Sequence, residues 1–105
     1  MTDPLDRLRQ QIADLRAEIE RLDSADAAFE SMLGELDHRA RRVRDGLERA
    51  GWRSRALEAE LKALERNRKT ASADREANAA KSAALRAELA EIQDRIAALG
   101  VAEDI

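Results

Sequence analysis

The chain has 105 residues, a net charge of −3 and 39% charged residues, but only one Trp, one Phe and no Tyr. A compact fold of this length needs a mixed set of large apolar and aromatic core side chains. Here 22 of the apolar residues are alanines. A composition rich in alanine and charged residues is typical of long helices and coiled coils. Because there is no cysteine, a disulfide framework and a thiolate metal site are both excluded.

The first helix is predicted to begin at about residue 3. Pro4 suits the first helical turn, where its missing N–H is not needed, and Thr2 or Asp3 can cap the helix. This N-terminal segment lacks the basic and apolar regions of a signal peptide, and no apolar run in the chain has membrane-spanning length. We therefore expect a cytoplasmic protein.

Apolar residues follow one seven-residue pattern from Leu5 to Leu99. With Leu5 at position a, 22 of the 28 a and d positions are apolar when alanine is counted. This alternating spacing of three and four residues is the one that a left-handed coiled coil requires. The polar exceptions are Asp26, Ser54, Arg68, Arg75, Asn78 and Ser82.

A turn is predicted at residues 51–53. If Gly51 is the left-handed residue after the helix, Trp52 and Leu47 occupy the two positions whose side chains touch in a Schellman cap. Ser54 can then cap the next helix. In one continuous helix, Trp52 would instead occupy the most exposed heptad position. We therefore expect one coiled-coil domain over residues 1–105, with helix 3–50, turn 51–53, helix 54–99 and a short tail 100–105.

The pairing of the two arms supports the same turn. Antiparallel arms joined there pair core positions whose numbers sum to 104, so that large residues face large ones near both ends of the arms. In the middle, Asp26 is expected to meet Asn78, and Phe29 and its apolar neighbours face residues 65–84, which contain no large apolar side chain. The predicted fold class is all-α, an antiparallel coiled-coil helical hairpin.

Two alternatives remain open. One is a long continuous coiled-coil helix in a parallel dimer, in which four of the five charged pairs flanking the core would be like-charged. The other breaks the chain near Asp23 and again near residues 70–74, giving three helices. The charge pattern and the position of Trp52 favour the hairpin.

A two-helix hairpin of this composition is expected to self-associate. Two helices leave one flank of their core in water, and 24 large apolar residues are few for a stable monomer of this size. A four-helix bundle or a partner helix supplies the missing burial. Phe29 and Met32 are candidates for that second contact, and the alternative is that they fill space opposite the alanine-rich segment.

No motif in the sequence indicates catalysis. His38 is the only histidine, most carboxylates lie at solvent-facing heptad positions, and the four glycines stand alone without forming a phosphate-binding loop. We therefore expect no enzyme activity, no catalytic residue, no cofactor, no metal and no small-molecule substrate.

Arginine is concentrated around the predicted turn. Residues 38–55 hold seven arginines against two carboxylates, next to the only tryptophan. In a hairpin they give the turn a positive charge that can neutralise phosphates of nucleic acid or lipid. Alternatively, Arg39 and Arg44 pair with Glu60 and Glu65 on the facing arm. The candidate partner or anion contacts are Arg39, Arg41, Arg42, Arg44, Arg49, Trp52, Arg53 and Arg55.

These features predict a non-enzymatic structural or interaction protein. It would act as a coiled-coil adaptor, scaffold or chaperone-like subunit that binds itself, a helical protein partner or both. The alternative function is an anion-binding module that uses the arginine-rich turn on nucleic acid or on a membrane surface.

Overall fold

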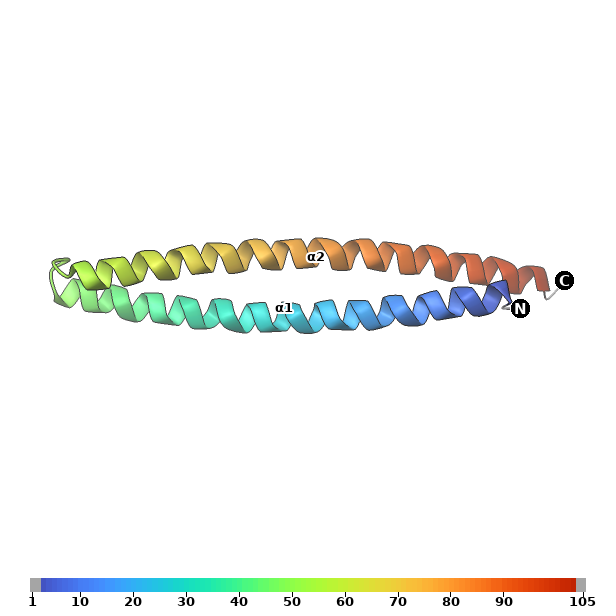
Figure 1. Cartoon of the computed structure of the whole chain (residues 1–105), viewed down its shortest axis with the longest axis horizontal. Coiled ribbons are helices and arrows are strands. Elements are labelled where there is room, and N and C mark those ends of the chain that lie inside the picture. Colours follow the sequence, from blue (N-terminus) through green and yellow to red (C-terminus); the bar gives the residue numbers. More distant parts are fainter. Residues whose placement is uncertain (1–2, 104–105) are drawn as a thin grey trace. The chain divides into compact units, whose positions relative to one another are not determined.

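The chain folds into two α-helices joined by a short turn (Figure 1). The computed structural model describes residues 3–103, and side chains are described up to Gly100. Helix α1 spans Pro4–Arg49 and helix α2 spans Arg55–Glu103. Neither helix is interrupted at Asp23 or at residues 70–74, so the three-helix alternative is wrong. The turn also contradicts the single continuous helix.

The helices pair antiparallel, which confirms the predicted fold class of an all-α helical hairpin (Figure 1). Their contacts divide the chain into two units. Unit 1 pairs the part of α1 up to Ala25 with the part of α2 from Asn78 onward, and unit 2 is formed by residues Asp26–Ala77 and contains the turn. The single-domain interpretation stays a prediction.

Buried side chains follow the predicted heptad. All nine buried apolar residues occupy a or d positions, which confirms that the same phase runs through both helices. They are Ile19, Leu22, Ala40, Val43, Leu47, Leu61, Leu64, Ala71 and Ile92. Most other a and d residues are half-buried, and the exposed exceptions are Ala50, Arg68 and Leu99. The heptad register therefore runs through both helices, but few side chains along it are fully buried.

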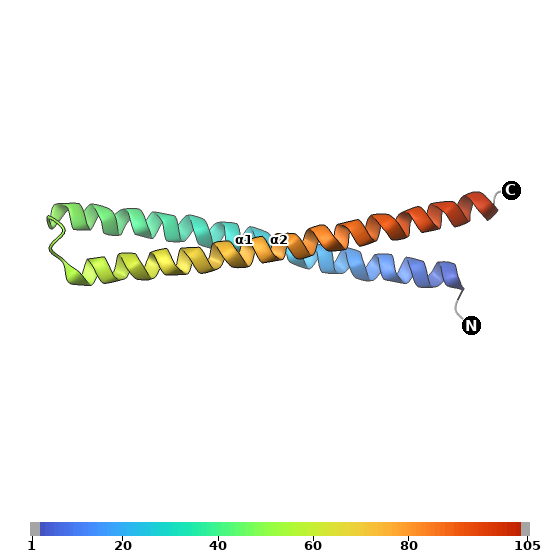
Figure 2. The ribbon, with the colours of Figure 1, turned by 90° about the horizontal axis from the view of Figure 1, so that it is seen from above.

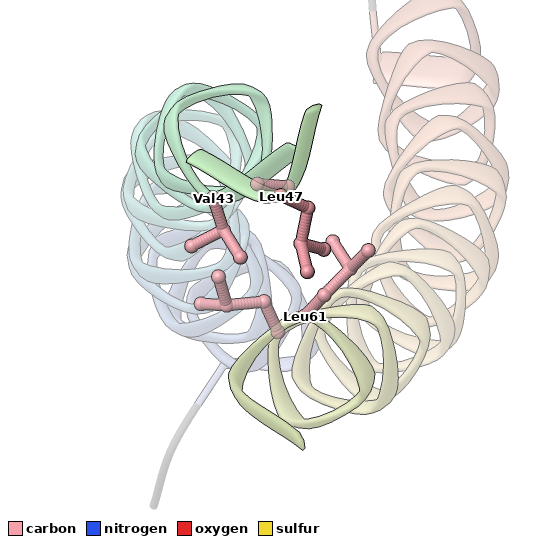
Figure 3. Close-up of a cluster of buried hydrophobic side chains, with 5 residues drawn as sticks. Val43, Leu47 and Leu61 are labelled. Atoms are coloured by element: carbon pink, nitrogen blue, oxygen red, sulfur yellow. The ribbon is translucent and has the colours of Figure 1, made fainter. Parts of the chain in front are cut away.

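The largest buried cluster lies in unit 2, near the turn. Figure 3 shows Val43 and Leu47 of α1 pointing toward Leu61 of α2. Ala40 and Leu64 complete the cluster, and the half-buried residues Leu36 and Leu57 pack against it. Leu47 is the one described large side chain with no exposed surface. Burial of this group favours closure of the hairpin at this end of the helices.

Both predicted helix starts are confirmed. The Leu5 N–H donates to the Asp3 carboxylate at 3.1 Å, so Asp3 caps α1 and Pro4 occupies its first turn. The Leu57 N–H donates to the Ser54 hydroxyl at 3.2 Å, so Ser54 caps α2. Each cap satisfies an N–H group that has no partner inside its helix.

The turn between the helices lies at the left of Figure 2. Its backbone hydrogen bonds are those of a Schellman motif. The Trp52 N–H donates to the Leu47 carbonyl at 2.8 Å, and the Gly51 N–H donates to the Glu48 carbonyl at 3.1 Å. Gly51 has a φ of 62°, the left-handed conformation expected from the sequence. Contact between the Trp52 and Leu47 side chains stays a prediction.

A Gly51→Ala substitution is expected to destabilise the hairpin by about 1–2 kcal/mol, because the left-handed conformation costs an L-residue about this much. A Cβ at Gly51 would meet no atom closer than Arg53 Nε at 4.0 Å, so backbone strain is the cause and not a clash. Urea denaturation followed by circular dichroism measures the change. Gly34→Ala is the control, since Gly34 lies inside α1 with nothing near its Cβ position, and there alanine should stabilise the helix.

The C-terminal boundary differs from the prediction. The sequence indicated a helix ending at residue 99 and a tail over 100–105, but α2 continues through Gly100 to Glu103. A single glycine weakens a helix without ending it unless it takes the left-handed conformation, and Gly100 does not. Residues 104 and 105 lie outside the described part of the chain.

The polar residues in the middle of the helices have other partners than predicted. Asp26 accepts two hydrogen bonds from Arg75, from Nε at 2.8 Å and from Nη2 at 3.3 Å. Asn78 instead donates its side-chain amide to the Leu22 backbone carbonyl at 2.8 Å. The expected meeting of Asp26 with Asn78 overlooked Arg75, whose charged fork binds a carboxylate more strongly than an amide does. The division between the two units falls at these polar core positions.

Candidate functional site

The eight predicted contact residues all lie in unit 2 and all are exposed. Five of them occupy the last three turns of α1, two lie in the connecting turn, and Arg55 begins α2. The Schellman motif and the Ser54 cap fix the path of the chain between these two groups. The hairpin therefore brings the arginines of both helices to the same end of unit 2, as predicted.

Three of the arginines are held by neighbouring groups. Arg39 pairs with Glu35 of the same helix at 3.1 Å, and Arg44 pairs with Glu65 of the facing helix at 3.6 Å. The Arg49 Nε–H donates to the Asp45 carbonyl at 3.3 Å, near the C-terminal end of α1. All three contacts are solvent-exposed and contribute little to stability.

One of the two predicted interhelix pairs is confirmed and the other is wrong. Arg44 does pair with Glu65, whereas Arg39 pairs with Glu35 and not with Glu60. Glu35 lies four residues before Arg39 on the same face of α1, so the two side chains meet without crossing to the other helix.

Four of the seven arginines in residues 38–55 form neither an ion pair nor a side-chain hydrogen bond with any group in the described part of the chain. We call them the unpaired arginines, and they are Arg41, Arg42, Arg53 and Arg55. Two carboxylates, Asp45 and Glu48, lie between residues 38 and 55, so this segment carries an excess of five positive charges. A concentrated and exposed charge of this kind attracts anions and anionic surfaces.

Trp52 stands among these arginines in an unusual conformation. Its φ is 59°, and it is the one described non-glycine residue with a positive φ. The residue is 52% exposed, which is unusual for a large aromatic residue. Backbone strain of this kind clusters at functional sites. The sequence predicted that Trp52 lies in the turn but not its left-handed backbone.

An open groove lies in the arginine-rich part of unit 2. It has a volume of about 630 Å³, and the apolar side chains of Val43, Leu57 and Leu64 contribute to its wall. Its charged lining residues are Arg39, Arg42, Asp45, Arg49 and Glu60. Because both charge signs are present, the groove by itself is not a strong anion site.

A second groove in unit 2 is lined by the two residues that were predicted as candidates for contact with another copy or a partner helix. Phe29 and Met32 both line it, together with Leu36, Asn67, Thr70, Ala71 and Asp74, and its volume is about 340 Å³. Phe29 is half-buried, whereas Met32 is 48% exposed. Sequence reasoning missed the α2 side of this groove, although the absence of large residues from 65 to 84 was a signal for it.

No protein-family model matches the chain, and neither a curated protein nor a solved structure matches it. Within residues 3–103, neither helix contains a segment long and apolar enough to cross a membrane. His38 is exposed, and its ring forms no ion pair with a described carboxylate. Two regions described above form the candidate site: the positively charged turn, and the groove beside Met32.

Proposed function

We propose that this chain is a non-enzymatic structural protein of the cytoplasm that works by binding a second copy of itself. The resulting helical bundle would serve as an adaptor or scaffold for a larger protein. The observation that carries this proposal is the groove around Met32, where an exposed apolar side chain lies beside a gap between the helices.

The thin core supports the need for a partner. Only nine side chains are buried among the described residues, although the two helices have 46 and 49 residues. Many core positions stay half-exposed because two helices cover only one side of each apolar stripe. In a four-helix bundle the same side chains are covered on both sides.

The shape of the groove favours a second copy as the occupant. Large residues of α1, Phe29 and Met32, lie beside the small residues Thr70 and Ala71 of α2. Around a two-fold axis, the large side chains of one copy can enter the groove of the other, and the reverse contact forms at the same time. One groove thus supplies both halves of the interface.

Sedimentation equilibrium tests this proposal. The wild-type protein is expected to have twice the chain mass of 11.7 kDa or a higher multiple of it. Met32→Glu places a charge in the groove and should weaken association by at least about 100-fold, since burial of an unpaired charge costs several kcal/mol.

Ser31→Glu is the matched control, because it adds the same charge at the neighbouring exposed position f of the heptad. It should leave the mass unchanged. A wild-type protein that stays monomeric at millimolar concentration, or equal effects of the two substitutions, would show that this groove does not join two copies.

A second candidate function, binding of an anionic surface, is favoured by the four unpaired arginines and the exposed Trp52. It involves a different part of unit 2 and does not depend on self-association.

A further inference from the structure

We propose that the hairpin turn binds an anionic membrane surface, with the indole of Trp52 entering the headgroup region while the unpaired arginines contact lipid phosphates. The observation behind this is the combination of one strained, exposed tryptophan with the four unpaired arginines. The proposal rests on the second candidate function, for which it names the surface, and it is independent of the dimer proposed above.

The conformation of Trp52 is the first argument. At a φ of 59° a glycine would have no steric cost, whereas tryptophan has one. Full burial does not offset this cost, because the residue is 52% exposed. An indole combines an apolar body with one polar N–H, and this is why tryptophan is enriched at the boundary between membrane and water.

The distribution of charge is the second argument. Residues 38–55 carry an excess of five positive charges, but unit 1 has seven basic and eleven acidic residues in its sequence and so a net charge of −4. An anionic surface therefore attracts the turn and repels unit 1. Each arginine close to such a surface strengthens binding by about fivefold, so the four unpaired arginines together account for several hundred-fold.

Other partners fit the turn less well. Single-stranded nucleic acid is bound by a series of aromatic residues on which successive bases stack, and this chain has one tryptophan and one half-buried phenylalanine. A stable protein interface uses about 20–30 residues on each side, many more than the turn offers. A bilayer requires no complementary shape. Because neither described helix can cross it, the contact would be peripheral.

Fluorescence of Trp52 tests the proposal directly, because it is the only indole in the protein. The full chain is mixed at low salt with vesicles of phosphatidylcholine and phosphatidylglycerol, and separately with vesicles of phosphatidylcholine alone. The emission should shift to shorter wavelength, and the protein should sediment with the vesicles, only when the anionic lipid is present. Raising the salt concentration should weaken the binding.

Two sets of substitutions locate the contact. Changing the four unpaired arginines to glutamine should weaken vesicle binding by at least about 100-fold. The matched control changes four exposed arginines away from the turn that also lack an ion pair in the described structure. It removes the same charge and should change binding by less than about fivefold. The control residues are Arg7, Arg16, Arg66 and Arg95.

Trp52→Gly separates the role of the indole from folding. It removes the side chain and relieves the backbone strain, so the hairpin should stay folded by circular dichroism while vesicle binding falls by about tenfold or more. Three results would overturn the proposal: no binding to anionic vesicles, equal losses in the two arginine variants, or tighter binding to single-stranded DNA than to anionic vesicles. The last result would assign the turn to nucleic acid.

Discussion

Replacing Leu47 by alanine should lower the free energy of unfolding by about 3 kcal/mol or more, the largest loss expected from any single truncation in this chain. Leu47 has no exposed surface and packs in the cluster that closes the hairpin in unit 2. Its backbone carbonyl also accepts the Trp52 N–H of the turn. A cavity at this point therefore weakens the contact between the helices where the chain reverses.

Urea denaturation followed by circular dichroism measures this effect, at a fixed protein concentration because association would add to the apparent stability. Leu36→Ala is the matched control, since Leu36 is half-buried at the edge of the same cluster. It should cost about half as much, because part of its surface already faces water. Equal losses at the two sites would contradict the description of Leu47 as the centre of the core.

The positions of the buried residues were predictable because they depend on periodicity alone. The heptad that begins at Leu5 predicted every buried side chain, from Ile19 to Ile92. The turn was predictable for a related reason, since Gly51 and Ser54 have strong preferences at helix ends. Local chemistry was sufficient in both cases.

Features that depend on individual side-chain conformations were not predictable in the same way. From the sequence, Arg39 could pair with either Glu35 or Glu60. The structure pairs it with Glu35, which lies one turn away on the same helix and is therefore the nearer carboxylate along the chain. The left-handed backbone conformation of Trp52 could not be predicted, because tryptophan has no preference for it. The grooves arise where large and small residues of different helices meet, which a heptad assignment does not describe.

The candidate site also has features that the sequence predicts and features that depend on side-chain conformation. The sequence positions of the arginines predicted that they lie near the turn. They did not predict which arginines form ion pairs, because that depends on which carboxylate lies within reach. Arg44 reaches Glu65 on the other helix, whereas Arg41 and Arg42 meet no carboxylate in the described part of the chain. This difference selects the residues for the vesicle experiment.

The pair formed by Asp26 and Arg75 should be replaceable with a gain in stability. Both residues occupy core a positions, and their side chains are 41% and 36% exposed. Changing both to leucine removes a charge pair and adds apolar burial, which often stabilises a protein. We expect the double variant to melt about 5 °C above the wild type at neutral pH, whereas Arg75→Leu alone should melt below it, because Asp26 loses its partner.

The pH dependence of this gain identifies its cause. The hydrogen bond from Arg75 lowers the pKa of Asp26, its positive charge adds to the effect, and partial burial opposes it. The folded pKa therefore lies below the unfolded value of about 3.9, so the pair stabilises the protein above that pH, and this stabilisation is lost as the pH falls through the folded pKa. The double variant lacks this loss. Its advantage in melting temperature should grow below about pH 4, and an advantage that stays constant down to pH 2 would mean that the Asp26 carboxylate contributes nothing to folding.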